Sequence, residues 1–253
     1  MLKIKTVKYK IRFLEDVVFK DEPEIAFLKA IYKRLKNILC INKNSRCSDC
    51  TYSGKCLYNY MSAGDFEFIE NMPVIINKPL LSGRNKKSGD VIDLKFTFLG
   101  DAAVHIDFLN YAVKEFETRG LFGEKYRFFI ESRTDNEIED KKDNSNVSSI
   151  KILTPIDRCE NIFKIEKEKI DNLNKLYRIT DKPIDLITEP YEFDAVRFKM
   201  QKPLYIGNKK LIRKGYVGTI KFREPIVNNN LLKIINLIGA GKFYAIGGGC
   251  IEI

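Results

Sequence analysis

The chain has 253 residues, with 44 Lys and Arg against 34 Asp and Glu, and a formal net charge of +10. This length suits two modest domains or one large one, and the positive excess suggests a polyanionic partner. No apolar run approaches the roughly 18 residues of a membrane span, and no signal peptide follows Met1. We therefore expect a cytoplasmic protein with no membrane partner.

The first half of the chain follows the order strand, helix, strand, helix, strand. Charged and apolar residues alternate near the N-terminus, which predicts a half-buried strand. Pro23 suits the first turn of the helix that follows. This order favours a ferredoxin-like β-α-β-β-α-β unit. The predicted elements are strands over 3–14, 91–99 and 125–131 and helices over 23–39 and 105–118, with room for one more strand in 72–80.

Four of the six cysteines lie close together in an insertion at about 40–60, in the spacing C-x6-C-x2-C-x5-C. In a cytoplasmic chain, clustered thiols favour a metal site over a disulfide framework. Four thiolates would form a closed, structural zinc site. An iron–sulfur cluster uses the same ligands, and free thiols or an adventitious disulfide stay open because the outer spacings are not those of a standard zinc finger. The candidate ligands are Cys40, Cys47, Cys50 and Cys56.

Residues 135–149 are polar and aperiodic, and we predict that they link a domain over 1–134 to a domain over 150–253. The second half repeats the plan of the first less clearly. We therefore predict an α+β fold of two tandem ferredoxin-like (RRM-like) domains. The predicted elements of the second half are a strand over 150–153, helices over 164–176 and 230–237, a long hairpin over 194–223 and a closing strand over 243–253.

The predicted hairpin is strongly basic. From Arg197 to Arg223 there are nine basic residues and no acidic one, and aromatic residues such as Tyr205 and Tyr216 are interleaved. Cations that follow phosphates and rings that stack on bases are typical of nucleic-acid-binding surfaces. A solvated basic hairpin is the alternative.

The last fifteen residues hold five of the chain's fifteen glycines, at 239, 241, 247, 248 and 249. Glycines at this density let a backbone approach a ligand closely and adopt positive φ. No helix follows them, so the segment is not a dinucleotide or Walker-type phosphate loop. A glycine-rich hairpin that only closes the chain is the alternative.

This tail resembles the C-terminal glycine-rich loop of the CRISPR repeat-associated (RAMP) superfamily. Within it, the chain is similar to the endoribonucleases that process precursor CRISPR RNA, in the branch with a cysteine-rich insertion after the first helix. Four further stretches carry the resemblance in chain order: Cys40 with the C-x2-C pair and Cys56-Leu57-Tyr58, Leu99-Gly100 with Gly120-Leu121-Phe122-Gly123, Thr154-Pro155, and Gly215-Tyr216-Val217-Gly218.

The resemblance implies tandem ferredoxin-like domains, binding of CRISPR repeat RNA and a single cut that needs no metal or other cofactor. In that reaction the RNA's own 2′-hydroxyl attacks the adjacent phosphate, which leaves a 2′,3′-cyclic phosphate and a 5′-hydroxyl. Precursor CRISPR RNA and other CRISPR effector subunits are the expected partners.

Many relatives place a histidine on the first helix, where this chain has Lys33 beside Tyr32. A lysine stabilises transition-state charge, but it acts as a base only if its pKa is lowered. The candidate catalytic residues are Lys33, Tyr32, Lys29 and the single histidine, His105. The expected RNA contacts are Lys209, Lys210, Arg213, Lys214 and Lys242, the backbone N–H groups of Gly241, Gly247, Gly248 and Gly249, and, more weakly, Arg34 and Lys36.

Two other classes of protein stay open. A non-catalytic RAMP subunit that grips guide RNA would explain the missing helix histidine, whereas the resemblance over the whole chain favours the nuclease. A zinc-ribbon nucleic-acid adaptor with no CRISPR role would explain the cysteines and the charge, but not the glycine-rich tail.

Overall fold

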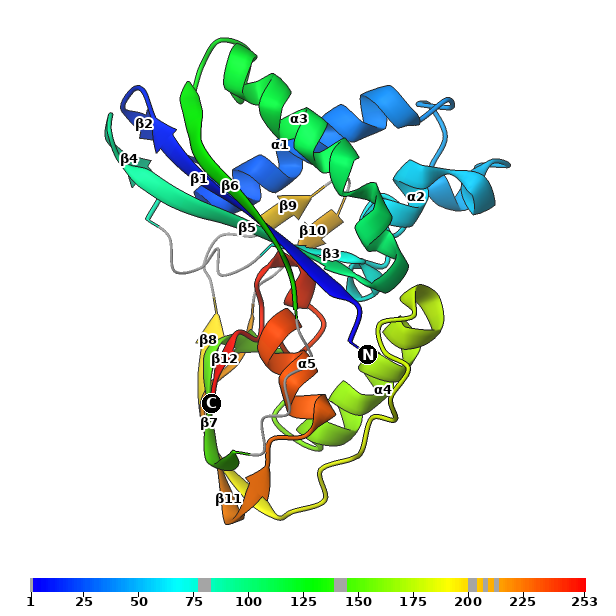
Figure 1. Ribbon diagram of the computed structural model, residues 1–253, viewed down its shortest axis with the longest axis vertical. Helices are drawn as coiled ribbons and strands as arrows, with labels where there is room; N and C mark the ends of the chain where they lie inside the picture. Colours follow the sequence, from blue (N-terminus) through cyan, green and yellow to red (C-terminus); the bar gives the residue numbers. More distant parts are fainter. Residues whose placement is uncertain (1, 77–82, 139–144, 200–203, 207–208, 212–213) are drawn as a thin grey trace.

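The computed structural model describes residues 2–76, 83–138, 145–199, 204–206, 209–211 and 214–253. The described chain contains two four-stranded antiparallel sheets, one in each half (Figure 1). Helices cover one face of each sheet, as the ferredoxin-like plan requires.

The first sheet has the strand order β3-β5-β1-β6. The second and third strands of the unit lie on one side of the first strand and the fourth on the other, which is the arrangement expected when two helices cross over the same face. The elements are β1 (Ile4–Phe13), α1 (Pro23–Leu39), β3 (Val74–Ile76), β5 (Val91–Leu99), α3 (Ile106–Arg119) and β6 (Phe128–Glu137). The short strands β2 (Val17–Val18) and β4 (Asn85–Lys86) pair beside this sheet, and α2 (Leu57–Ser62) lies in the cysteine-rich insertion.

The alternating burial of side chains along β1 shows what each face of the first sheet contacts. Val7, Tyr9 and Ile11 are fully buried, and Tyr9 donates its hydroxyl to Asn110 on α3, so the odd-numbered residues pack under the helices. The even-numbered Thr6 and Lys8 line a cavity on the other face. The helix-free face of the first sheet therefore looks towards the second half of the chain.

The second sheet has the order β12-β7-β11-β8, which repeats the plan of the first. A short hairpin, β9–β10, lies inside the predicted long hairpin, between β8 and β11. The elements are β7 (Asn146–Ile156), α4 (Ile162–Tyr177), β8 (Tyr191–Lys199), β9 (Leu204–Ile206), β10 (Lys209–Leu211), β11 (Lys214–Val227), α5 (Asn230–Ile238) and β12 (Ile251–Glu252).

Two expectations about boundaries differ from the structure. The closing strand predicted over 243–253 is only the two-residue strand β12, because five glycines fold the preceding segment into a compact loop. The predicted linker over 135–149 is partly strand, since β6 runs to Glu137 and β7 begins at Asn146. Polar, edge-exposed strand ends lack the apolar alternation that would reveal them in the sequence.

The two halves share backbone contacts and one continuous core. Leu2 bridges to Thr180, and the N–H of Lys3 donates to the carbonyl of Ile179. Gly100, at φ +50°, lies so close to Tyr177 that a Cβ atom would stand 1.7 Å from its carbonyl oxygen. Among the described residues, no helix has the length and apolar content to cross a bilayer.

Candidate functional site

The glycine-rich loop, residues 239–250, is hydrogen-bonded to itself and to the second sheet. Gly247 donates its N–H to the carbonyl of Tyr244, Gly248 to that of Phe243 and Gly249 to that of Pro155. Gly241 donates to the side chain of Glu166 at 2.6 Å. The four N–H groups that were expected to contact RNA thus already have acceptors inside the protein, which corrects that expectation.

The glycines are needed because the loop packs against itself. Gly249 has φ +64°, and a Cβ atom there would stand 1.9 Å from the carbonyl oxygen of Ala240. A threonine is needed near the end of β7 because its hydroxyl joins two parts of the loop. The hydroxyl of Thr154 donates to the carbonyl of Gly247 at 2.8 Å and accepts from the N–H of Cys250 at 2.7 Å. The loop is therefore a rigid scaffold.

An ion pair on α4 holds the other side of this loop. Lys169 lies 2.5 Å from Glu166, and both side chains are nearly buried. The Lys169 ammonium donates to the carbonyls of Gly239 and Gly241 at 3.0 and 3.3 Å, and it lies 4.8 Å from the centre of the Tyr244 ring. A buried charge pair of this kind is stabilising only when its remaining polar atoms are satisfied. Here the loop backbone satisfies the Lys169 ammonium and Oε1 of Glu166, whereas Oε2 of Glu166 has only the ion pair with Lys169.

What the loop presents to solvent is one cation and one ring. Lys242 is exposed, Phe243 is half-buried, and the Lys242 ammonium lies 5.1 Å from the centre of the Phe243 ring. The N–H of Lys242 donates to Asp157 at 3.0 Å, which fixes the backbone beneath this side chain.

Two adjoining cavities, of about 850 and 280 Å³, open beside this tip. Lys242 and Phe243 line both of them, and together we call them the basic groove. The smaller cavity has four cationic side chains and one acidic one, Asp157. The larger cavity is also lined by the acidic residues Glu70, Asp157, Glu166 and Glu168, so the excess of positive charge lies mainly in the smaller one. Cations in a cleft raise the local concentration of an anionic ligand, and rings can stack on its bases. The cations at the surface of the groove are Arg158, Arg197, Lys210, Lys214 and Lys242, and its rings are Tyr216 and Phe243.

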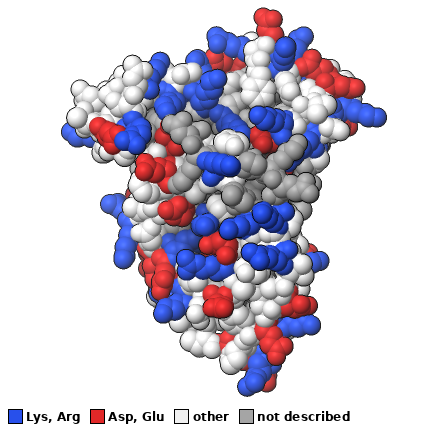
Figure 2. Space-filling model, turned by 180° about the vertical axis from the view of Figure 1, so that it is seen from behind, with Lys and Arg blue, Asp and Glu red and all other residues white. Residues whose placement is uncertain are grey.

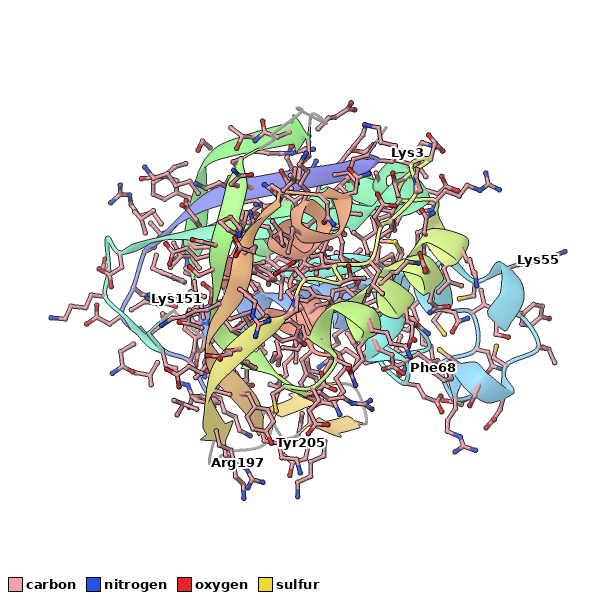
Figure 3. All side chains as sticks on the ribbon, turned by 90° about the horizontal axis from the view of Figure 1, so that it is seen from below. Lys3, Lys55, Phe68, Lys151, Arg197 and Tyr205 are labelled. Atoms are coloured by element: carbon pink, nitrogen blue, oxygen red, sulfur yellow. The ribbon has the colours of Figure 1, made fainter. Side chains whose placement is uncertain are left out.

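Basic side chains gather around the middle of the back face of the molecule (Figure 2). Arg197 and the half-exposed Tyr205 point out from this same side (Figure 3). Of the basic residues predicted to bind RNA, Lys210, Lys214 and Lys242 line the groove. Lys209 lies in β10, and Arg213 lies outside the described residues.

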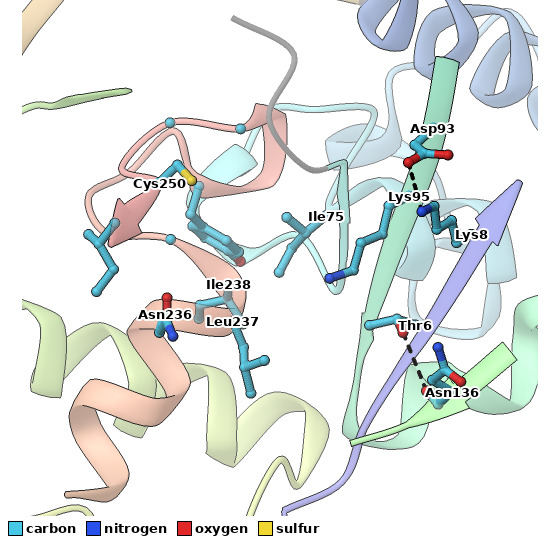
Figure 4. Close-up of a pocket in the computed structure, with 15 residues that line it drawn as sticks. Thr6, Lys8, Ile75, Asp93, Lys95, Asn136, Asn236, Leu237, Ile238 and Cys250 are labelled. Carbon is cyan, nitrogen blue, oxygen red and sulfur yellow. Dashed lines mark hydrogen bonds and ion pairs between the residues drawn. The ribbon is translucent and has the colours of Figure 1, made fainter. Parts of the chain in front are cut away.

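A second cavity, of about 460 Å³, lies on the other side of the glycine-rich loop, against the open face of the first sheet (Figure 4). Lys95 points into it from β5, whereas Lys8 is paired with Asp93 at 2.7 Å. Because this cavity has fewer cations than the basic groove, it is the weaker candidate for a polyanion.

Two of the predicted catalytic residues are held away from any substrate. Tyr32 is 1% exposed and donates its hydroxyl to the carbonyl of Met61, and burial raises its pKa far above the ordinary value. Tyr32 is therefore a core residue. Lys29 forms a 2.5 Å ion pair with Asp21.

Lys33 and His105 are the other two predicted catalytic residues. Lys33 is exposed on α1 and makes no hydrogen bond or ion pair within the described part of the chain. His105 is half-buried at the start of α3, with its ring 5.8 Å from that of Tyr60, and burial lowers its pKa. Neither side chain lines the basic groove. The weaker candidates Arg34 and Lys36 are paired with Glu115 and Asp65, each at 2.6 Å.

The four clustered cysteines are all partly exposed. Burial raises the pKa of the Cys47 thiol to about 11, with further contributions from Asp65 and the neighbouring thiols. Across the described ranges, no group of three or more His, Cys, Asp or Glu side chains is placed to hold a metal ion. The present arrangement does not gather the thiols as ligands, and the structural zinc stays a prediction.

Comparison with known proteins now places the chain. Residues 2–156, more than half of it, match the family described as AF_1859_N: N-terminal domain. The chain belongs to this family. Among curated proteins, none matches the sequence.

The fold of the chain is also similar to the folds of several solved structures. The fold is similar to that of Thermus thermophilus Cas6 in a product complex, with a TM-score of 0.53 and 12% identity over 99% of both chains. It is equally similar to the product of a Cas6-related gene from Pyrococcus furiosus, with a TM-score of 0.53 and 11% identity over 99% of this chain and 98% of that one. A RAMP protein that binds different RNA substrates gives a TM-score of 0.50 and 10% identity over 98% of each chain. The chain therefore has the Cas6 and RAMP fold along its whole length.

Several residues of the site could not be found from the sequence. Arg158 stands between Asp157 and Glu160, so no run of positive charge marks it. Glu166 and Lys169, three residues apart on a charged helix, have the spacing of an ordinary surface pair. Only the folded glycine-rich loop reveals that they are buried.

Proposed function

We propose that the chain is an endoribonuclease that binds CRISPR repeat RNA and cuts the precursor transcript without a metal ion. The observation that carries the proposal is the basic groove, which lies at the tip of the glycine-rich loop in a chain with the Cas6 fold over its whole length. The similar Cas6 and RAMP structures include a product complex and RNA complexes, which supports RNA as the ligand.

In the proposed reaction, a base takes the proton of an RNA 2′-hydroxyl, and the freed oxygen forms a new bond to the adjacent phosphorus. The bond from phosphorus to the 5′-oxygen breaks, and that oxygen takes up a proton. The cations of the groove would hold the phosphates of the RNA on either side of the cut. Lys33 and His105 are the catalytic candidates that remain, because Tyr32 is buried and Lys29 is paired with Asp21.

The proposal is tested with labelled repeat RNA in EDTA, beside the same RNA with a 2′-deoxy nucleotide at the scissile position. We expect one cut with the first RNA and none with the second, because the attacking oxygen is missing. Lys33→Ala and His105→Ala then show which side chain the cut requires.

RNA binding is tested separately from cleavage. Neutralising a phosphate contact lowers the affinity and reduces the dependence of log K on log salt by about one. We expect this effect for Lys242→Ala and not for Lys151→Ala, since Lys151 is exposed on β7, away from Arg197 and Tyr205 (Figure 3). Tight binding with no cut of any repeat would instead identify a non-catalytic RAMP subunit.

A further inference from the structure

A third cavity, of about 430 Å³, lies between the cysteine-rich insertion and α4. It differs from the basic groove in that no charged side chain lines it. Phe68 and Leu176 each leave 48% of their surface exposed at its edge, and Tyr60 and Tyr177 form a further part of the wall. Its polar lining is neutral: Ser48, Ser53, Asn59 and Asn71.

The backbone before Phe68 is unusual and fixes the ring. Ala63, Gly64, Asp65 and Phe66 are four successive residues with positive φ, between 45° and 76°. A non-glycine residue in this region is strained, and such strain is concentrated at ligand-binding and active sites. The N–H of Phe68 donates to the carbonyl of Ala63 at 3.0 Å.

Contacts with the segment also hold the Phe68 ring in place. A Cβ atom on Gly64 would stand 3.2 Å from the ring, so the ring rests against that glycine. Asp65 accepts a hydrogen bond from the hydroxyl of Tyr58 on α2 and forms an ion pair with Lys36 on α1 at 2.6 Å. The exposed ring is therefore part of an ordered segment rather than a loose loop tip.

The cavity adjoins the basic groove. Asn71 lines both, and its side-chain oxygen accepts a hydrogen bond from Asn172 of α4 at 3.0 Å. The 3₁₀ turn Ile69–Asn71, which follows Phe68 directly, contacts the turn Tyr244–Ile246 of the glycine-rich loop. An extended strand whose phosphates lie in the groove beside Asn71 would therefore bring neighbouring bases to Phe68.

We propose that this cavity is a subsite for one unpaired nucleobase, with Phe68 as its stacking platform. The inference rests on the proposed binding of RNA in the basic groove. An aromatic surface beside neutral amide and hydroxyl groups matches a base, which has two flat faces and a polar edge. Because no cation lines the cavity, it favours a neutral base over a phosphate.

The first test is the affinity of Phe68→Ala for repeat RNA, measured over a series of salt concentrations. Base–aromatic stacking lost on truncation to alanine corresponds to a weakening of about 5- to 150-fold. Because stacking releases no counterion, the salt dependence stays at the wild-type value, unlike that of Lys242→Ala. Phe68→Tyr retains the ring and the affinity, whereas Phe68→Leu retains apolar bulk and loses affinity.

Phe122→Ala is the matched control. Phe122 leaves 49% of its surface exposed and packs on Tyr126, beyond the end of α3 and outside all the cavities described above. We expect it to bind RNA with the wild-type affinity and salt dependence.

A scan of single abasic nucleotides along the repeat, performed with the wild-type protein, locates the base that is bound. At one position, the abasic nucleotide should weaken binding as much as Phe68→Ala does. At that position alone, the losses of affinity from the abasic nucleotide and from Phe68→Ala should not add. If Phe68→Ala fails to fold, Phe68→Leu takes its place in this comparison.

The outcomes separate the two proposals. If the wild type binds RNA through Lys242 while Phe68→Ala equals Phe122→Ala, the subsite is overturned. Additivity at every abasic position overturns the subsite as well. If the wild type binds no repeat RNA, the proposed function itself fails.

Discussion

Two lysines at the glycine-rich loop have different roles. Lys169 is buried, paired with Glu166 and bonded to loop carbonyls, so it stabilises the loop. Lys242 is exposed at the tip and lies over Phe243, so it is free to meet a ligand. Burial and partners, rather than residue type, decide which lysine belongs to a binding surface.

At the residue scale, the single histidine allows a direct pH test. Burial lowers the pKa of His105, so the folded protein holds its proton less tightly than the unfolded chain. The contribution of neutral His105 to the free energy of unfolding should therefore be complete above the unfolded pKa of about 6.5. It should be lost as the pH drops below that value.

His105→Gln should remove this part of the pH dependence, and NMR titration of the one imidazole in the wild type should give a pKa below 6.5. A pKa at or above the ordinary value would contradict the half-buried position of His105.

Gly249 and Gly54 provide a matched pair for the loop backbone. Gly249→Ala puts a methyl group 1.9 Å from the carbonyl oxygen of Ala240 at φ +64°, whereas a Cβ atom on Gly54 meets nothing within 4 Å. We expect Gly249→Ala to lower the free energy of unfolding by about 2–5 kcal/mol, from left-handed strain and overpacking. Urea denaturation measures both variants, and similar values for the two would show that the loop can relax.

At the element scale, α4 both covers the second sheet and holds the glycine-rich loop. Its apolar face buries Phe163, Ile170 and Leu173. A neighbouring face presents Glu166 and Lys169 to the loop backbone. A helix that packs a sheet therefore also orients the side chains of the basic groove.

Removal of one partner of this pair tests the role of the helix. Glu166→Ala leaves the Lys169 ammonium buried without its carboxylate and the N–H of Gly241 without an acceptor. We expect a loss of about 3–5 kcal/mol in the free energy of unfolding. Glu168→Ala, on the exposed side of the same helix, is the control and should change it little. Equal effects of the two substitutions would show that the ion pair is not needed.

At the scale of the whole molecule, hydrogen bonds join the two ferredoxin-like units. Tyr244 of the glycine-rich loop donates its hydroxyl to the carbonyl of Met72 at 2.6 Å, and Tyr177 of α4 donates to that of Asn71 at 2.6 Å. Both acceptors lie just before β3 of the first sheet. The basic groove borders this junction, so its shape depends on both units.

The shared core predicts that the two units unfold together. Because the chain has no tryptophan, tyrosine fluorescence reports on residues of the junction such as Tyr177 and Tyr244. We expect its urea transition to coincide with that of far-ultraviolet circular dichroism. Two separate transitions would mean that each unit is stable alone.

The sequence determined the order of elements and the two-unit plan, because apolar periodicity is a local property of the chain. The strand over 91–99 has the predicted bounds, and α1 begins at Pro23 as predicted. The basic stretch also pointed to the surface on which Lys210 and Lys214 lie.

Only the tertiary structure decided which polar groups are free. In the folded chain, the N–H groups of the glycine-rich loop donate to acceptors within the protein, and Tyr32 is buried with its hydroxyl bonded to Met61. Arg158 lines the same cavity as Lys242. The tertiary structure also joined Phe68 to a cavity next to the groove. Burial and hydrogen-bond partners depend on segments far apart in the chain, and a sequence pattern carries no direct record of them.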